Sequence, residues 1–219
     1  MIPTASADFV CQMERVLDVY ALAYDPEHPV VCMDESPKQL LEHKHEAYTD
    51  KQGILHQDYE YVRKGVQDLY MITEPLAGRR EVLIKPNHNS QTYAQVIAHI
   101  AEQMYPQQQQ ITLIEDNHSA HRMAALYEIF PPERARSIVE KFQIVRTPAH
   151  GSWLNIAECE LSVLIRYGLK ERIKDRFELE KEVKQWYQRR NQKQAGVNWQ
   201  FKTKDARTKL KTLYPKIST

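Results

Sequence analysis

The spacing of hydrophobic positions along the chain switches between helical and strand periods, and this predicts an α/β protein. Residues 6–22 have apolar side chains every third or fourth position, which predicts a lead-in helix. Residues 30–36 are a nearly continuous apolar run that ends in carboxylates, a pattern typical of a buried strand. We expect Pro37 to end this strand and polar residues 39–57 to form a long surface loop.

The middle of the chain changes to strand patterns. Gly65 and residues 75–78 supply the breaks between three expected strands, which we interpret as an antiparallel meander over residues 59–63, 68–74 and 80–84. Residues 90–104 then carry one apolar face at helical spacing and end before Pro106, which predicts an amphipathic helix.

Two more strand patterns follow, at residues 111–116 and 142–146. A helix expected over residues 117–130 would connect them as a β-α-β unit with parallel pairing. Two further helices are predicted, over residues 152–167 and 178–191. Together these elements predict an RNase H-like mixed five-stranded sheet with helices on both faces. The 30–36 strand would lie at its centre beside the 111–116 strand.

Composition indicates an ordinary soluble protein of one sizeable core, with 219 residues of which 42% are hydrophobic and 27% charged. No run of 18 apolar residues and no secretory leader is present, so we expect a cytoplasmic protein without a membrane span. Three cysteines without a C-x-x-C pair argue against a disulfide framework and a cysteine-based zinc site.

Charge is distributed unevenly along the chain. Residues 1–60 have net charge −8, residues 61–150 have +1 and residues 151–219 have +8. A basic end is compatible with a polyanion partner, although a solvated helix face is the simpler explanation of any one run. The candidate phosphate contacts are Arg189, Arg190, Lys193, Lys202, Lys204 and Arg207.

Carboxylates end both buried strands, at Asp34 and Asp116, and Glu158 lies early in a predicted helix. Metal-assisted phosphoryl transfer needs acidic residues from separate elements, because two Mg²⁺ ions about 3.5–4 Å apart share oxygens with the phosphate. Singly, each acid is more typical of a cap or turn. Neighbouring acids compete for each position, and the residue pattern leaves the choice open between these and Glu35, Glu115 and Glu160.

Three strings carry a resemblance to a known family: C-M-D-E-S-P-K-Q-L, I-E-D-N-H-S-A-H and P-A-H-G-S-W-L-N-I-A-E. They resemble the DDE transposases of the mariner-like superfamily, specifically the bacterial insertion sequence 630 family. The similarity covers nearly the whole chain. By motif it assigns the catalytic and metal-binding acids to Asp34, Asp116 and Glu158, and it also matches Asn117 and His121.

The resemblance implies a nuclease and strand transferase that uses two Mg²⁺ or Mn²⁺ ions. Its expected partners are transposon terminal inverted repeats, TA target DNA and a second copy of the chain. It divides the chain into a lead-in helix at residues 1–28, an RNase H-like DDE catalytic domain at residues 29–191 and a basic C-terminal segment at residues 192–219.

Supporting roles each have a simpler alternative. Asn117 is interpreted as a phosphate contact or a helix cap, and His121 as a DNA contact, a carboxylate-orienting group or an idle helix-surface histidine. His150 and Trp153 would line the site, although core packing also accounts for Trp153.

Family transposases add an N-terminal helix-turn-helix region, for which this chain has no room. We therefore expect either an excised domain or a truncated reading frame. Two other interpretations stay open, a non-catalytic remnant that dimerises or binds DNA and a general RNase H-like nuclease. A zinc protein that uses His43 and His45 ranks last.

Overall fold

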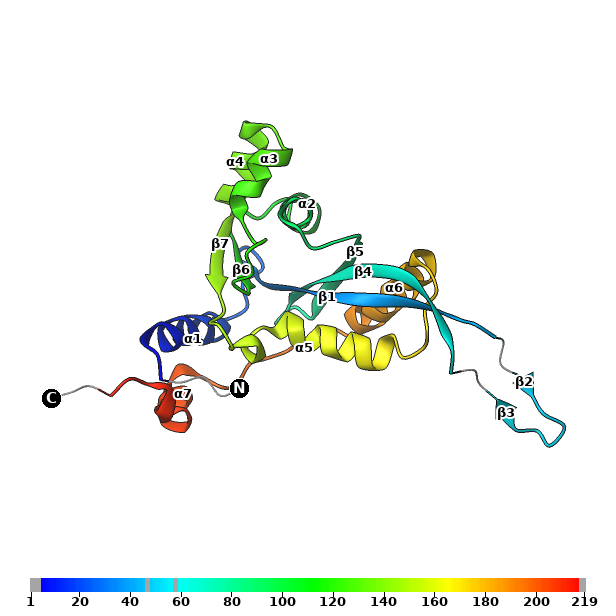
Figure 1. The fold of residues 1–219 in the computed structure, drawn as a ribbon. Coiled ribbons are helices and arrows are strands. Elements are labelled where there is room, and N and C mark those ends of the chain that lie inside the picture. Colours follow the sequence, from blue (N-terminus) through cyan, green and yellow to red (C-terminus); the bar gives the residue numbers. More distant parts are fainter. Residues whose placement is uncertain (1–4, 46–47, 57–58, 217–219) are drawn as a thin grey trace.

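A mixed five-stranded sheet forms the centre of the computed structural model, which describes residues 5–45, 48–56 and 59–216 (Figure 1). The strand order is β5-β4-β1-β6-β7. Pairing is antiparallel in β5-β4-β1 and parallel in β1-β6-β7. The strands are β1 Val30–His43, β4 Tyr61–Glu74, β5 Arg79–Lys85, β6 Ile111–Glu115 and β7 Phe142–Arg146. The predicted mixed sheet, with the first strand central and beside β6, is confirmed.

Helices cover both faces of this sheet. On one face, a core that includes Cys32 and Ile114 packs against α1 Ala7–Tyr20, α5 Ile156–Val163 and α6 Arg176–Gln192. On the other face, Val31 and Leu113 pack against α2 Ser90–His99 and α4 Pro132–Glu140. No helix within the described ranges is long and apolar enough to cross a membrane.

The smaller elements complete or connect the main ones. The five-residue π-helical turns Ile100–Met104 and Leu164–Gly168 extend α2 and α5. Between β6 and β7 the chain forms a 3₁₀ turn, Met123–Ala125, and α3 Leu126–Ile129 before α4. Near the C-terminus, α7 Thr203–Lys209 packs against α1 and is followed by a 3₁₀ turn, Lys211–Leu213.

The first strand is longer than predicted, because Pro37 lies inside β1 and does not end it. Strand β6 pairs with β1 only over Val30–Cys32. Beyond Cys32, the edge of β1 that faces β6 is therefore not hydrogen-bonded to that strand. Proline is tolerated in such an edge because its missing N–H breaks no ladder bond there. The described residues of the 39–57 segment are correspondingly not a long loop. β1 continues to His43, and a small hairpin pairs β2 Tyr48–Thr49 with β3 Leu55–His56 (Figure 1).

A single long strand, β4, replaces the two strands expected at 59–63 and 68–74. Gly65 lies inside β4 with a φ of +103°, where the register with β1 shifts between Gln39 and Leu41. Its left-handed conformation therefore forms a bulge that bends the strand, and not a turn between strands.

The helix expected from residue 117 begins only at Met123. Residues 117–122 form a loop, since the Asp116 carboxylate accepts the His118 N–H at 2.9 Å and the His118 carbonyl accepts the His121 N–H at 3.0 Å. Such local bonds compete with helix formation.

Candidate active site

The parallel register of β1 and β6 brings two of the predicted acids together. Cys32 pairs with Ile114. Asp34 lies two residues further along β1, on the same face as Cys32, and Asp116 directly follows β6, two residues after Ile114. Because side chains alternate across the sheet, Glu35 and Glu115 belong to the opposite, α2 face. The structure thus separates the acid pairs that the sequence pattern left open.

Asn155 connects the third acid to the same strand. It is the N-cap of α5, where its Oδ1 accepts the Ala157 N–H at 3.1 Å. Its Nδ2 donates to the Met33 carbonyl at 3.0 Å and to Asp34 Oδ2 at 3.2 Å. These bonds hold the first turn of α5, which contains Glu158, against β1. The sequence interpretation missed Asn155, although an asparagine directly before an apolar helical run is a cap signal.

The carboxylates act on one another electrostatically. The pKa of Asp34 is raised to about 7, mainly by burial; the negative charges of Glu35, Asp116 and Glu158 also raise it, and the hydrogen bond from the Glu35 N–H opposes the shift. Such concentrated negative charge is what a bound divalent cation would neutralise. Three carboxylates are also the oxygen donors that Mg²⁺ prefers, so these residues fit the metal that the resemblance implies.

Asp116 is held by His121, which is buried in the loop and does not lie on a helix surface. The imidazole Nδ1 lies 2.8 Å from Asp116 Oδ1, and Nε2 donates to Glu35 Oε2 at 3.1 Å. The ring stacks on Tyr93 with centroids 4.8 Å apart. Burial alone would lower the pKa of His121, but its bonds to the two carboxylates outweigh it and raise the pKa to about 10. Burial would likewise raise the pKa of Asp116, yet the contacts from His121 and the His118 N–H lower it.

The competing acids on β6 and α5 are committed to internal pairs. Glu115 is fully buried, accepts the Tyr93 hydroxyl at 3.0 Å and lies 3.1 Å from Arg146. Glu160 is buried between Arg80 and Arg190, at 3.1 and 2.8 Å. Arg190, a predicted DNA contact, thus has its guanidinium group turned to an internal carboxylate.

The predicted supporting residues lie in different surroundings. Asn117 and His150 line a cleft of about 240 Å³ beside the start of α1. Asn117 caps no helix, because the helical turns begin later. His150 has a left-handed φ of 63°. Trp153 is 39% exposed and packs near Trp199 and Phe201, which anchor the C-terminal segment to the core.

The remaining predicted DNA contacts are exposed and fall on two elements. Arg189 and Lys193 lie at the C-terminal end of α6, while Lys202 and Lys204 lie at the start of α7. Arg207, also on α7, forms a two-bond ion pair with Glu14 at 2.7–2.8 Å.

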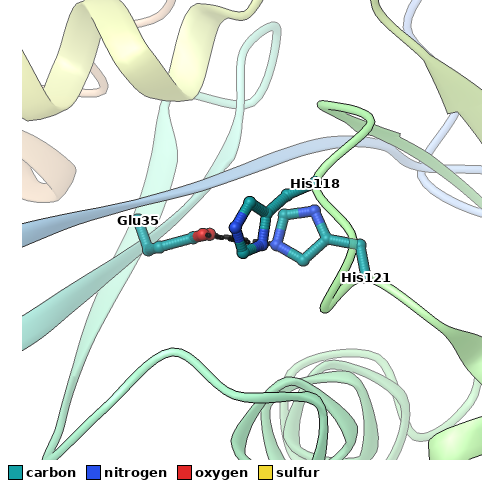
Figure 2. Close-up of side chains that lie close together, drawn as sticks. All are labelled: Glu35, His118 and His121. Atoms are coloured by element: carbon teal, nitrogen blue, oxygen red, sulfur yellow. Dashed lines mark hydrogen bonds and ion pairs between the residues drawn. The ribbon is translucent and has the colours of Figure 1, made fainter.

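A second polar group lies on the α2 face, formed by Glu35, His118 and His121 (Figure 2). One ligand atom of each lies within 4.8 Å of the others, which makes them a group able to hold a metal among the described residues. The sequence interpretation treated Glu35 only as a competitor of Asp34 and gave His118 no role.

The sequence profile of the DDE superfamily endonucleases matches residues 29–180, more than half of the chain. The chain belongs to the DDE superfamily endonucleases. A search of the curated proteins finds no match for this DDE family member.

Solved structures with the same fold are complexes of the Mos1 mariner transposase. The Mos1 paired-end complex with Mn matches at a TM-score of 0.56 and 13% identity, covering 96% of this chain and 63% of that one. The strand transfer complex matches at 0.54 and 16%, covering 85% and 57%. The pre-cleavage transpososome matches at 0.52 and 14%, covering 100% and 67%. The DDE chain therefore has the RNase H-like fold of these proteins and spans about three fifths of the length of the first of them.

Proposed function

We propose that the chain is the catalytic domain of a DDE transposase of the insertion sequence 630 family, which cleaves DNA and transfers strands at transposon ends. The observation that supports this most is the electrostatic effect of Asp116 and Glu158 on Asp34, which lies on β1 beside β6, the strand that Asp116 directly follows. Membership of the DDE endonucleases supplies the reaction class.

In this proposal Asp34, Asp116 and Glu158 hold two Mg²⁺ or Mn²⁺ ions. The ions would activate the attacking oxygen and stabilise the leaving one. Asn155 holds Asp34 and the start of α5 in place, and His121 holds Asp116. These hydrogen bonds and ion pairs from Asn155 and His121 keep the carboxylates oriented before the substrate binds, as a pre-organised site requires.

The DNA-binding surface is proposed to include Asn117, His150 and Trp153 beside the acids. Arg189, Lys193, Lys202 and Lys204 would add phosphate contacts, each increasing the salt dependence of binding. The proposed substrates are terminal inverted repeats and TA target DNA. Residues 29–191 are proposed to bind and cleave them in the cytoplasm, and residues 192–219 to add DNA contacts.

A homodimer is proposed as the working assembly. The β1-β4 arm projects from the sheet (Figure 1) and carries exposed Tyr61, Val62 and Val66. Apolar side chains on a projecting arm favour contact with a second protein surface.

Nicking of supercoiled plasmid tests the function. Wild-type chain should nick DNA with Mg²⁺ or Mn²⁺ and stop when EDTA is added, and Asp116→Asn should be inactive with an unchanged circular dichroism spectrum. The matched control is Glu133→Gln, an exposed acid on α4, which should retain wild-type nicking. Undiminished nicking by the folded Asp116→Asn variant would contradict the proposal.

A further inference from the structure

A histidine-rich cluster lies on the α2 face of the sheet, across from Asp34 and Glu158. Its centre is the group Glu35, His118 and His121 (Figure 2). We propose that this cluster binds one transition-metal ion of the Zn²⁺ type, separate from the Mg²⁺ or Mn²⁺ ions of the proposed reaction. The proposal does not depend on the chain being a transposase.

The donor set selects the class of metal. Two imidazoles and one carboxylate suit borderline ions such as Zn²⁺, whereas Mg²⁺ prefers oxygen ligands. The ligand atoms lie within 4.8 Å of one another. Two ligands on one Zn²⁺ lie about 3–4 Å apart at bond lengths of about 2.0–2.2 Å, so small side-chain rotations close the site.

His121 is oriented as a metal ligand. Its Nδ1 faces Asp116 at 2.8 Å, and its Nε2 faces Glu35 at 3.1 Å. Metal-binding histidines usually direct the second ring nitrogen to a carboxylate, which fixes the ring and its tautomer. An ion at Nε2 would replace the proton that His121 now shares with Glu35 and leave the Asp116 contact intact.

His88 repeats this arrangement and offers a fourth ligand. Its Nδ1 lies 3.1 Å from Asp68 Oδ2, which leaves Nε2 for an ion. Asp68 is 4% exposed, and its Oδ1 has no hydrogen-bond partner among the described residues. The His88 and His118 ring centres lie 5.7 Å apart, and those of His118 and His121 lie 5.4 Å apart. Two imidazoles on one tetrahedral Zn²⁺ have ring centres about 5 Å apart, given Zn–N bonds of about 2.0–2.1 Å.

An open cleft gives an ion access to the cluster. It has a volume of about 480 Å³, and both His88 and His118 line it. Glu35 and His121 lie deeper, with side chains 11% and 1% exposed. The more exposed histidines could therefore capture the ion and the buried pair complete its coordination.

The site would also connect to the opposite face. His121 contacts both Glu35 and Asp116, so an ion bound at Nε2 adds positive charge one imidazole ring away from Asp116. The expected role is to fix the position of Asp116, since outer contacts of this kind orient a carboxylate.

The test is metal binding to tag-free, chelator-treated full chain, measured by Zn²⁺ calorimetry and by the visible absorption of bound Co²⁺. Wild type should bind one equivalent. Glu35→Gln and His118→Gln should each weaken Zn²⁺ binding at least about tenfold, because each removes a ligand. These variants are preferred to substitutions of His121, because His121 is buried and its replacement could destabilise the fold.

Two controls make the outcome specific. His99→Gln should bind Zn²⁺ like wild type, because His99 forms a similar histidine-carboxylate pair with Glu81 at 3.1 Å but lies outside the cluster. The double variant Asp34→Asn with Glu158→Gln should also retain Zn²⁺ while losing nicking, which separates this site from the proposed function. No binding by wild type, undiminished binding by Glu35→Gln and His118→Gln, or loss of binding in the double variant would each overturn the proposal.

Discussion

Two glutamates of α5, Glu158 and Glu160, stand two residues apart, and the same substitution should affect them in opposite ways. Glu160 pairs with Arg80, whose side chain is fully buried, and with Arg190, whose side chain is 29% exposed. Glu160→Gln would leave Arg80 charged and buried, with only neutral acceptors left: the carbonyls of Gly78 and Ala195 and the side chain of Asn191.

The size of this effect follows from burial. Removing one partner of a buried ion pair costs about 3–5 kcal/mol, mostly because the other charge is left uncompensated. Solvent screens the Arg190 contact, so we take the lower end, about 3 kcal/mol. For a chain of this size each kcal/mol changes Tm by about 2–4 °C, and the expected loss is about 6–12 °C.

Urea unfolding and thermal melts followed by circular dichroism measure this loss, with Glu158→Gln as the matched control. Glu158 raises the pKa of Asp34 by repulsion, so its neutralisation should leave the free energy of unfolding within about 1 kcal/mol of wild type while nicking is lost. A Glu160→Gln variant that melts within about 2 °C of wild type, or a Glu158→Gln variant that melts below it, would refute this reasoning.

The pKa of Asp34 is about 7, so Mg²⁺ should compete with a proton and bind more tightly as pH rises from about 6 to about 8; calorimetry that finds pH-independent affinity would contradict this. The pKa of His121 is raised from 6.5 to about 10 on folding, so its contribution to stability should be complete below pH 6.5 and lost as pH rises to about 10. The decline in Tm over that range should be shallower in His121→Gln, and equal slopes would disprove the linkage. Gly78→Ala should cost about 1–3 kcal/mol, because φ is +66° and the new Cβ would lie 2.7 Å from the Gln194 carbonyl carbon. Gly53→Ala, with φ +82° and no atom within 4 Å of the Cβ, should cost less in the same urea titration.

The central part of the sheet was predictable because its signals are local. Continuous apolar runs indicated buried strands at β1 and β6, and the helical segment expected between β6 and β7 indicated a crossover with parallel pairing. Of the two acids expected at strand ends, Asp116 directly follows β6, whereas Asp34 lies inside β1, which continues to His43. Period-two alternation also separated Asp34 from Glu35 correctly.

The errors arose where pairing across the sheet decides the conformation. Pro37 and Gly65 are breakers in an isolated segment, but Pro37 pairs with Asp68, and the β1-β4 ladder continues on both sides of Gly65, which forms a bulge. Residues 117–122 are not helical because the Asp116 side chain bonds its own loop.

The cluster of Glu35, His118 and His121 could not be predicted from the sequence, because it too depends on contacts made only in the folded sheet. Glu35 and His121 are separated by 86 positions and meet only through the fold. No spacing rule links them, whereas Asn155 carried a local cap signal that could have been used.

We propose that Asp34, Asp116 and Glu158 hold the divalent ions used in DNA cleavage. The most direct test is anomalous diffraction from Mn²⁺ in crystals of the chain with DNA bound. Mn²⁺ peaks are expected between these three carboxylates, on the α5 face of the sheet. Peaks confined to Glu35, His118 and His121, with the three acids free of metal, would contradict it.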